Sequence, residues 1–261
     1  MKKKNIIFNA DDYGREIQIN AAIQEAIKKG FVTDVSIMTT CHEGYQNLIE
    51  QGGFDIINYK GGIHLCLTLG KPLSKKILTT KLVDNEGGFR DKSNCVLHVK
   101  NNKKAIEEEF CTQIEKLKEV SDFKVTHLDS HQHIHFDINI LPIAVSLCKR
   151  YGIPCMRIPS YSKDLSLKSR IGTLLKIAYI KIRGIKVVDF FGSPSQIKGV
   201  SKRNYSTFEL MCHPWYNCEG KIVNKVAIYE ADDCNLLESD LALFLHENKI
   251  TYNDIIENKL Q

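Results

Sequence analysis

The stretch Asn5-Ile-Ile-Phe-Asn-Ala-Asp-Asp-Tyr-Gly14 decides the fold, because a short apolar strand is followed directly by two carboxylates and then by a helical pattern. The predicted helix carries apolar residues at helical spacing: Ile19, Ile23, Ala26 and Ile27. Gly30, just past the last of them, predicts where this helix ends. A strand that leads into a helix is the repeating unit of a parallel sheet.

The same unit recurs along the chain. The further strands that we predict lie at about 32–39, 63–67, 125–130, 154–158, 187–191 and 208–212. The further helices that we predict lie at about 45–51, 106–117, 138–150, 165–182 and 235–247, and a polar loop is expected over 70–101. About seven strands alternating with helices indicate an α/β fold. We favour a TIM-barrel-related (β/α) barrel over a doubly wound sheet, with residues 1–261 as a single domain.

Composition narrows the function classes. Hydrophobic residues make up 43% of the 261 residues and charged residues 26%, which excludes a disordered, collagen-like or coiled-coil chain. The net charge of +5 is spread along the chain and gives no support for a nucleic-acid partner. No apolar run approaches the roughly 18 residues that a membrane helix needs, and the N-terminus lacks the apolar stretch of a signal peptide. Nine cysteines without a Cys-x-x-Cys pair indicate free thiols, so we expect a cytoplasmic protein.

Polar residues gather where the predicted strands end, which is where barrel enzymes carry their catalytic groups. Asp11 and Asp12 are adjacent carboxylates directly after the first strand. Asp12 alone would suit the N-cap of the following helix, but a cap needs only one carboxylate. Two like charges at one strand end therefore indicate a bound cation.

Histidines follow the later strands. His64, on the strand at 63–67, is expected to share one face with Cys66 and Thr68. A single strand histidine is more typical of a structural residue than of a metal ligand, so His64 needs support from elsewhere in the sequence.

That support comes from 126–135, Thr-His-Leu-Asp-Ser-His-Gln-His-Ile-His, which holds four of the nine histidines. In an extended chain, five polar side chains would point the same way: His127, Asp129, His131, His133 and His135. Burying them without partners would cost on the order of several kcal/mol, so we favour a ligand site over a solvated surface strand. Histidine is the commonest protein metal ligand.

The strand at 208–212 is followed by His213, Pro214 and Trp215. Pro214 is expected to stop regular strand pairing and so to leave His213 at the strand end as a candidate proton donor. Trp215 offers a flat face of the kind on which sugar rings stack, with a core aromatic residue as the alternative. The defining residues of phosphate-binding loops, Rossmann folds, zincins and hydrolase elbows are missing from the sequence, which excludes those classes.

Four segments, in order and spacing, resemble the YdjC-like carbohydrate deacetylases, a family that includes chitooligosaccharide deacetylases. These segments are 9–14, 62–65, 126–135 and 209–214. The resemblance covers most of the chain, and the third segment is highly specific. It implies a barrel-like fold and metal-dependent removal of an acetyl group from an N-acetylated sugar. Trp215 stands where the family commonly has a small residue, which bears on substrate specificity.

The resemblance also implies roles for the candidate residues. Asp11 would be the catalytic base, and one divalent cation, Mg²⁺ or Zn²⁺, would be held by Asp12, His64 and His131. His213 would donate a proton to the departing sugar amine. The surrounding residues are expected to support the ligands or to contact the substrate: His127, Asp129, His133, His135, Arg157 and Trp215. Arg157 in particular is expected to bind substrate or to orient Asp11, unless it is an ordinary surface residue.

Two other functions fit parts of this pattern. A metal-dependent sugar isomerase or lyase would use similar ligands, but it would need a second base, often a lysine at a strand end, and the sequence shows no convincing one. A non-catalytic carbohydrate- or metal-binding barrel would have no use for Asp11 beside a ligand carboxylate.

The helix predicted from about 165 to 183 carries an apolar stripe and five basic residues without an acidic one. We expect the stripe to pack on the sheet and the basic side to face water. The alternative is a weak contact of this helix with a membrane surface, near a lipid-linked substrate. A homodimer is a further possible partner.

Overall fold

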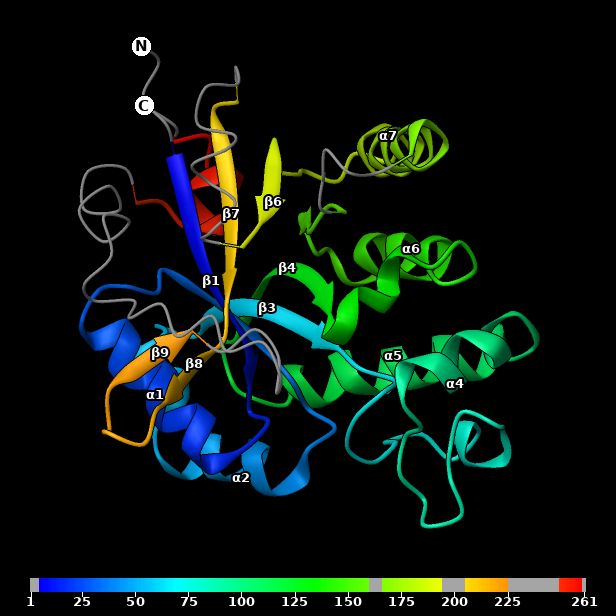
Figure 1. The fold of residues 1–261 in the computed structure, drawn as a ribbon, viewed down its shortest axis with the longest axis horizontal. Helices are drawn as coiled ribbons and strands as arrows, with labels where there is room; N and C mark the ends of the chain where they lie inside the picture. The colour runs from blue at the N-terminus through cyan, green and yellow to red at the C-terminus, as the bar shows by residue number, and fades with distance from the viewer. Residues whose placement is uncertain (1–4, 160–165, 194–204, 225–248, 260–261) are drawn as a thin grey trace.

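The structure is a computed structural model that describes residues 5–159, 166–193, 205–224 and 249–259. A sheet of seven parallel strands forms its centre (Figure 1). The strands are β1 (Asn5–Tyr13), β2 (Asp34–Ile37), β3 (Lys60–Leu65), β4 (Lys124–Ser130), β5 (Cys155–Met156), β6 (Phe190–Gly192) and β7 (Thr207–Cys212). Their order across the sheet is β5-β4-β3-β2-β1-β7-β6, and every neighbouring pair is parallel.

The sheet curls into a barrel-like shape, which confirms the predicted α/β barrel-like fold. β1 lies between β2 and β7, and all nine of its residues are buried, as its apolar sequence requires. A parallel bridge between Cys155 and Lys186 also places the edge strand β5 beside the segment that leads into β6. The carboxyl ends of all strands therefore meet at one end of the sheet, and the candidate residues with them.

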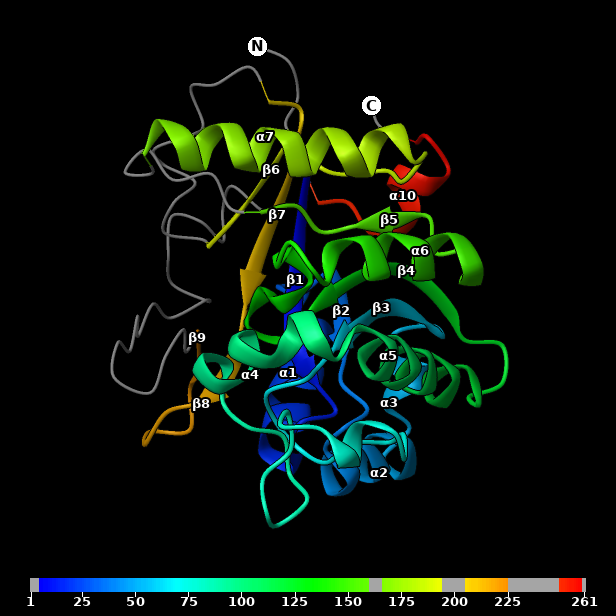
Figure 2. The ribbon, with the colours of Figure 1, turned by 90° about the vertical axis from the view of Figure 1, so that its right-hand side faces the viewer.

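Helices surround the sheet (Figures 1 and 2). They are α1 (Ile17–Lys28), α2 (His42–Glu50), α3 (Gly53–Ile56), α4 (Lys92–His98), α5 (Lys103–Lys118), α6 (Leu141–Tyr151), α7 (Leu167–Ile182) and α10 (Tyr252–Ile256). Short 3₁₀ helices are η1 (Ile77–Thr79), η2 (Val99–Asn101) and η3 (His131–Phe136). In the part of the chain that the structure describes, no helix is long and apolar enough to cross a membrane.

The prediction of a polar loop over 70–101 is wrong in part, because this segment contains η1, α4 and η2. The Asp91 carboxylate accepts a hydrogen bond from the backbone N–H of Asn94 and so caps α4. α4 buries only Cys95, so no apolar periodicity marks it in the sequence. The helix predicted at 235–247 lies outside the described residues.

The expectation that regular pairing stops at Pro214 is confirmed for β7, which leaves His213 at the strand end, but a new strand begins at Pro214. β7 ends at Cys212, but β8 (Pro214–Tyr216) follows at once and pairs antiparallel with β9 (Ile222–Asn224). Pro214 is the first residue of a strand in a two-stranded sheet, a position where a missing N–H is tolerated.

The packing expected for α7 is wrong as well. Its buried residues are Thr173 and Ile180, whereas the apolar residues of the stripe, such as Leu167 and Leu175, are exposed. The sequence pattern identified the helix but not the side that faces the sheet.

Candidate metal centre and active site

The two adjacent carboxylates lie at an irregularity near the end of β1. The register between β1 and β2 shifts between Ala10 and Tyr13, and Asp12 has a φ of 66°, in the left-handed region that residues other than glycine rarely adopt. Such bulges redirect side chains and are common beside active sites. Here Asp12 contacts two histidines, whereas Asp11 contacts an arginine.

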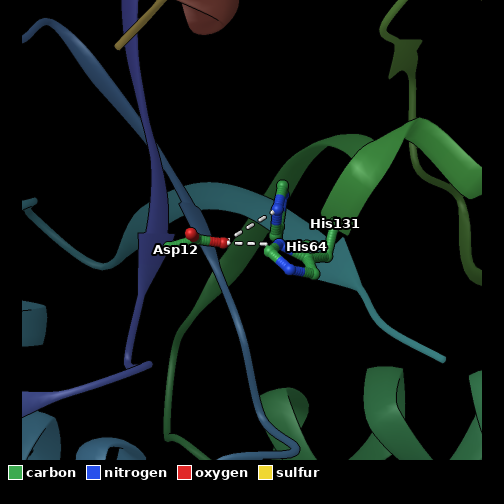
Figure 3. Close-up of side chains that lie close together, drawn as sticks. All are labelled: Asp12, His64 and His131. Carbon is green, nitrogen blue, oxygen red and sulfur yellow. Dashed lines mark hydrogen bonds and ion pairs between the residues drawn. The ribbon is translucent and has the colours of Figure 1, made fainter. Parts of the chain in front are cut away.

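Asp12, His64 and His131 form a group that we call the Asp12 cluster (Figure 3). Asp12 Oδ1 lies 3.3 Å from His64 Nε2 and 3.0 Å from His131 Nδ1. The three ligand atoms come from β1, β3 and the start of η3, and all lie within 4.8 Å of one another. The His131 side chain keeps 14% of its surface exposed, against 4% for Asp12, so the cluster reaches solvent on the His131 side.

Asp129 fixes the orientation of His64. Its Oδ1 lies 2.7 Å from His64 Nδ1, which leaves Nε2 to face Asp12. Metal-binding histidines commonly donate their second N–H to a carboxylate in this way. Burial opposes a charge on His64, but Asp129 and Asp12 outweigh it and raise its pKa to about 10.

Asp12 stays ionised in the same cluster. Burial would raise its pKa, but contacts with His131 and His64 hold that pKa well below its usual value. The other Asp12 oxygen, Oδ2, accepts a hydrogen bond of 3.0 Å from Arg15 Nη1. The donor set of one carboxylate oxygen and two imidazole nitrogens therefore fits a divalent cation.

A second group lies next to the first, and we call it the Arg157 cluster: Arg157 with Asp11, Asp129 and Glu209. Arg157 is fully buried and binds Asp11 through two hydrogen bonds, of 2.7 Å from Nη1 and 2.6 Å from Nη2. Its Nη2 also lies 2.6 Å from Asp129 Oδ2 and 2.7 Å from Glu209 Oε1. Arg157 is thus not a surface residue and contacts Asp11, and its role in orienting Asp11 stays a prediction.

The guanidinium sets the charge of its neighbours. Burial would raise the pKa of Asp11, but Arg157 lowers it below the usual value, so Asp11 is a carboxylate. Glu209 differs, because burial and Asp129 outweigh Arg157 and raise its pKa to about 7. Tyr252 donates its hydroxyl to Glu209 Oε2 at 2.5 Å and closes this cluster on the side away from Asp11.

His127 belongs to the supporting structure and not to the Asp12 cluster. Its ring stacks on Tyr252 with centroids 3.9 Å apart, and its Nε2 lies 3.0 Å from Ser36 Oγ. Burial lowers the pKa of His127 to about 3, so the ring is neutral. Gly62 is required beside it, because a Cβ there would lie 2.3 Å from His127 Nε2.

The strand predicted at 125–130 is confirmed, and the chain does not stay extended through His135. β4 ends at Ser130, and the chain turns into η3, where Gln132 and His133 have φ values of 52° and 57°. Ser130 Oγ accepts a hydrogen bond from the His135 backbone N–H and holds this turn. The turn brings His131 to Asp12 and sends the later histidines elsewhere.

His133 and His135 pack among aromatic rings instead. The His133 ring meets Phe191 edge-on at 5.3 Å, and His135 lies 3.8 Å from Phe136. Burial lowers the pKa of His133 to about 3 and that of His135 well below its usual value. Both rings are therefore neutral, and their roles in substrate contact stay predictions.

His213 and Trp215 lie where β7 passes into β8. The His213 backbone N–H donates to Asn224 Oδ1 at 2.8 Å, while its ring Nδ1 is buried and has no hydrogen-bond partner among the described residues. Burial lowers the pKa of His213, although the charges of Asp11 and Asp12 act in the opposite direction. Trp215 is half-buried and packs against the hydrophobic core.

Sequence reasoning missed several supporting residues. Ser36 donates to Asp129 Oδ2 at 2.7 Å, and Asn9 Nδ2 donates to Asp11 Oδ1 at 2.8 Å. Asn9 and Glu209 stand inside the quoted segments, but nothing in the sequence shows that Glu209 lies beside Arg157. That contact depends on the pairing of β1 with β7, in which Glu209 stands opposite Ile7.

A separate cavity of about 260 Å³ lies at the other end of the sheet. Its lining includes Thr33, Asp34 and Lys60, at the amino ends of β2 and β3. The clustered ligand atoms lie at the carboxyl ends, so this cavity is not the candidate active site.

Comparisons with known proteins identify the family of this chain. The model of the YdjC-like protein family matches residues 5–249, nearly the whole chain. The chain belongs to the YdjC-like family. A carbohydrate deacetylase of Clostridium beijerinckii is 30% identical over 220 residues, covering 81% of each chain. A carbohydrate deacetylase of Brevibacillus brevis is 27% identical and covers 94% of this chain and 96% of its own.

A solved structure supports the same fold for this YdjC-like chain. It is a candidate cellobiose-phosphate cleavage protein of Enterococcus faecalis, with a TM-score of 0.75 and 22% identity, covering 97% of this chain and 99% of that one. At this identity the likeness concerns the fold alone. The predicted family and the predicted barrel-like fold are therefore both confirmed.

Proposed function

We propose that this YdjC-like protein is a carbohydrate deacetylase that hydrolyses the N-acetyl group of a sugar with the help of one divalent cation. One observation carries the proposal: Asp12, His64 and His131 bring three metal-ligand atoms together directly beside Asp11, a carboxylate fixed by Arg157. Membership of a family whose relatives are named carbohydrate deacetylases supplies the reaction.

Asp12, His64 and His131 would hold the cation. Two imidazoles and one carboxylate suit Zn²⁺ at least as well as Mg²⁺, and we propose a single ion of this kind. When bound, such an ion polarises the amide carbonyl and lowers the pKa of water. Asp129 supports this site by holding the His64 ring with Nε2 toward Asp12.

Asp11 would take the proton of the attacking water. Each carboxylate oxygen accepts about two hydrogen bonds, and Oδ1 already accepts from Arg157 and Asn9. Oδ2 accepts only the bond from Arg157 Nη1 among the described contacts, which leaves one acceptor position for a proton. Arg157 therefore orients the base while keeping it ionised.

His213 would supply a proton to the departing sugar nitrogen. Its ring Nδ1 is buried and makes no hydrogen bond to the described residues, and its pKa is influenced by Asp11 and Asp12. Because burial lowers the pKa of His213, the imidazolium releases its proton readily once formed. The reaction balances when the amide and one water give acetate and a protonated amine, because both protons of the water end on the sugar nitrogen and Asp11 and His213 return to their starting states.

The substrate that we propose is an oligosaccharide or glycolipid that contains N-acetylglucosamine. The half-buried Trp215 follows directly after His213 and Pro214, and its ring would be a stacking face for a sugar beside the reacting amide.

The test is acetate release from a panel of N-acetylated glycans by the metal-loaded protein. We expect acetate and free amine in equal amounts from at least one N-acetylglucosamine glycan, and release that is slower by roughly 10²-fold or more from the Asp11→Asn protein loaded with the same metal. Sugar isomerisation without acetate would favour an isomerase instead. Metal-dependent binding of glycans without turnover, unchanged in the Asp11→Asn protein, would favour a binding module.

A further inference from the structure

α7 presents its apolar residues to solvent. The residues that make up this α7 stripe are Leu167, Ile171, Leu174, Leu175, Ala178 and Ile182. Its five large members are between 50% and 82% exposed. Figure 2 shows α7 along the edge of the molecule, on the outside of the strands β5, β6 and β7.

The stripe lies on the side of α7 opposite to the protein core. Successive helix residues are about 100° apart, so the six residues fall within an arc of roughly 100°. Thr173 and Ile180, the buried residues of α7, lie about 160° from the centre of that arc. α7 packs Ile177, Tyr179 and Ile180 against the core, but it leaves the α7 stripe exposed, whereas a helix on a sheet normally faces water with polar residues.

Basic residues border the stripe on both sides. On the same helical projection Lys168 lies at one edge, and Arg170 and Lys181 lie at the other. Lys176 and Arg183 add two more positive charges, and the sequence from 165 to 188 contains no acidic residue. An exposed apolar stripe between basic edges is the pattern of helices that lie in a membrane interface.

We propose that α7 docks the protein on the anionic surface of a lipid bilayer. The α7 stripe would enter the boundary between headgroups and acyl chains, and the basic side chains at its edges would reach the lipid phosphates. α7 has 16 residues and carries basic residues along its length, so it would lie on the membrane and not cross it.

A second copy of this chain fits the stripe less well. A two-fold contact brings the same surface of each subunit together. Two α7 helices would then meet with five basic residues each and no acidic residue on either, and like charges repel. An anionic surface satisfies both the apolar and the charged part of α7.

Sedimentation of the wild-type protein with lipid vesicles tests the proposal. We expect binding to vesicles of phosphatidylcholine mixed with phosphatidylglycerol, weaker binding at higher salt, and little binding to phosphatidylcholine alone. Replacing Lys168, Arg170 and Lys181 by Gln should weaken binding by roughly 100-fold, since each basic charge near an anionic surface contributes about tenfold or less.

The matched control replaces Lys75, Lys103 and Lys104 by Gln. These lysines are exposed and lie outside α7. The control has the same net charge as the first variant, and it should bind vesicles like the wild type. A second variant, Leu167→Ser with Leu175→Ser and Ile182→Ser, should lose vesicle binding at low salt while its unfolding curve stays that of the wild type, because these side chains are exposed.

Three results would overturn the proposal. The first is no sedimentation of the wild type with anionic vesicles at low salt, and the second is an equal loss of binding in the Lys168, Arg170 and Lys181 variant and in its control. The third is a dimer in light scattering that the serine variant converts to a monomer. The last would show that a second copy covers α7. None of these measurements depends on deacetylation.

Discussion

Two neighbouring clusters of buried charged residues differ in how their charge is balanced. In the Arg157 cluster, a guanidinium contacts three carboxylates at 2.6 to 2.7 Å. In the Asp12 cluster, one carboxylate oxygen faces two imidazoles at 3.0 and 3.3 Å, and the nearby Arg15 contacts the other oxygen. The first cluster contains its own cation, whereas the second places three atoms that could bind a cation within 4.8 Å of one another. Similar residue types therefore build an arginine-centred cluster in one place and a candidate metal centre in the other.

The largest effect on stability should come from removing Arg157, the positive charge at the centre of the Arg157 cluster. Arg157→Met leaves Asp11 and Asp129 buried without their cation, which costs about 3–5 kcal/mol when one partner of a buried pair is lost. We expect the free energy of unfolding in urea to fall by this amount. Arg150→Met, which breaks the exposed contact with Glu107, is the control and should change little. Equal curves for both variants would show that Arg157 does not hold the clusters together.

Asp11→Asn separates the chemistry from the metal site. The amide keeps the size of the side chain but cannot take a proton, so the rate of acetate release should fall roughly 10²-fold or more. Metal content should stay at one ion per chain, because Asp11 is not a ligand in this account. Near-normal turnover of the variant would exclude Asp11 as the base.

Asp129 belongs to the Arg157 cluster and also contacts His64 of the Asp12 cluster. Its replacement should weaken metal binding by a smaller factor than the loss of activity expected for Asp11→Asn. Asp129→Asn weakens the hold on His64 Nδ1, and the loss of such a supporting carboxylate typically costs about 10–100-fold in metal affinity. Ser36→Ala removes only the hydrogen bond to Asp129 Oδ2 and should cost less. Competition titration with a chelating dye measures both, and unchanged affinity in the Asp129 variant would contradict its role.

The smallest expected effect is the change in metal affinity with each pH unit. In the metal-free protein the pKa of His64 is raised to about 10, so a cation that binds Nε2 below that pH must displace a proton. Metal affinity should therefore rise about tenfold per pH unit toward pH 10, with proton release visible by calorimetry in buffers of different ionisation enthalpy.

The same shift fixes the sign of the pH effect on stability. The pKa of His64 in the folded protein lies above its unfolded value, so its ion pair with Asp129 stabilises the metal-free protein below about pH 6.5. That contribution is lost as the pH rises through about 10. Stability of the metal-free protein that does not fall over this range would contradict the predicted protonation of His64.

The sequence predicted the strands better than the turns that join them. Apolar runs between polar ends are visible in a sequence, so β1, β4 and β7 were located to within a few residues. The end of β4 at Ser130 agrees with the predicted strand, but the directions of the histidines after it were not predicted. Alternating histidines continue the period of two, and no glycine or proline marks the left-handed Gln132 and His133. The sequence did not predict that the apolar stripe of α7 faces outward. Helical spacing identifies an apolar stripe, but it does not show what packs on it.

The pairing of buried charges could not be predicted either. Arg157 and Glu209 are 52 positions apart, and their contact requires the strand order that places β7 beside β1. Asp12 was identified from its neighbour Asp11, but the bulge that separates their contacts appears only in the backbone.

The most direct test of the account is metal content measured together with activity in the wild type, His131→Ala and His42→Ala proteins. His131 is the most exposed member of the Asp12 cluster, so its replacement should leave the fold intact. His42 is an exposed histidine at the start of α2 and serves as the control. We expect one divalent ion per chain and acetate release in the wild type and in His42→Ala. In His131→Ala we expect the loss of both. A His131→Ala protein that keeps the ion and the activity would contradict the account.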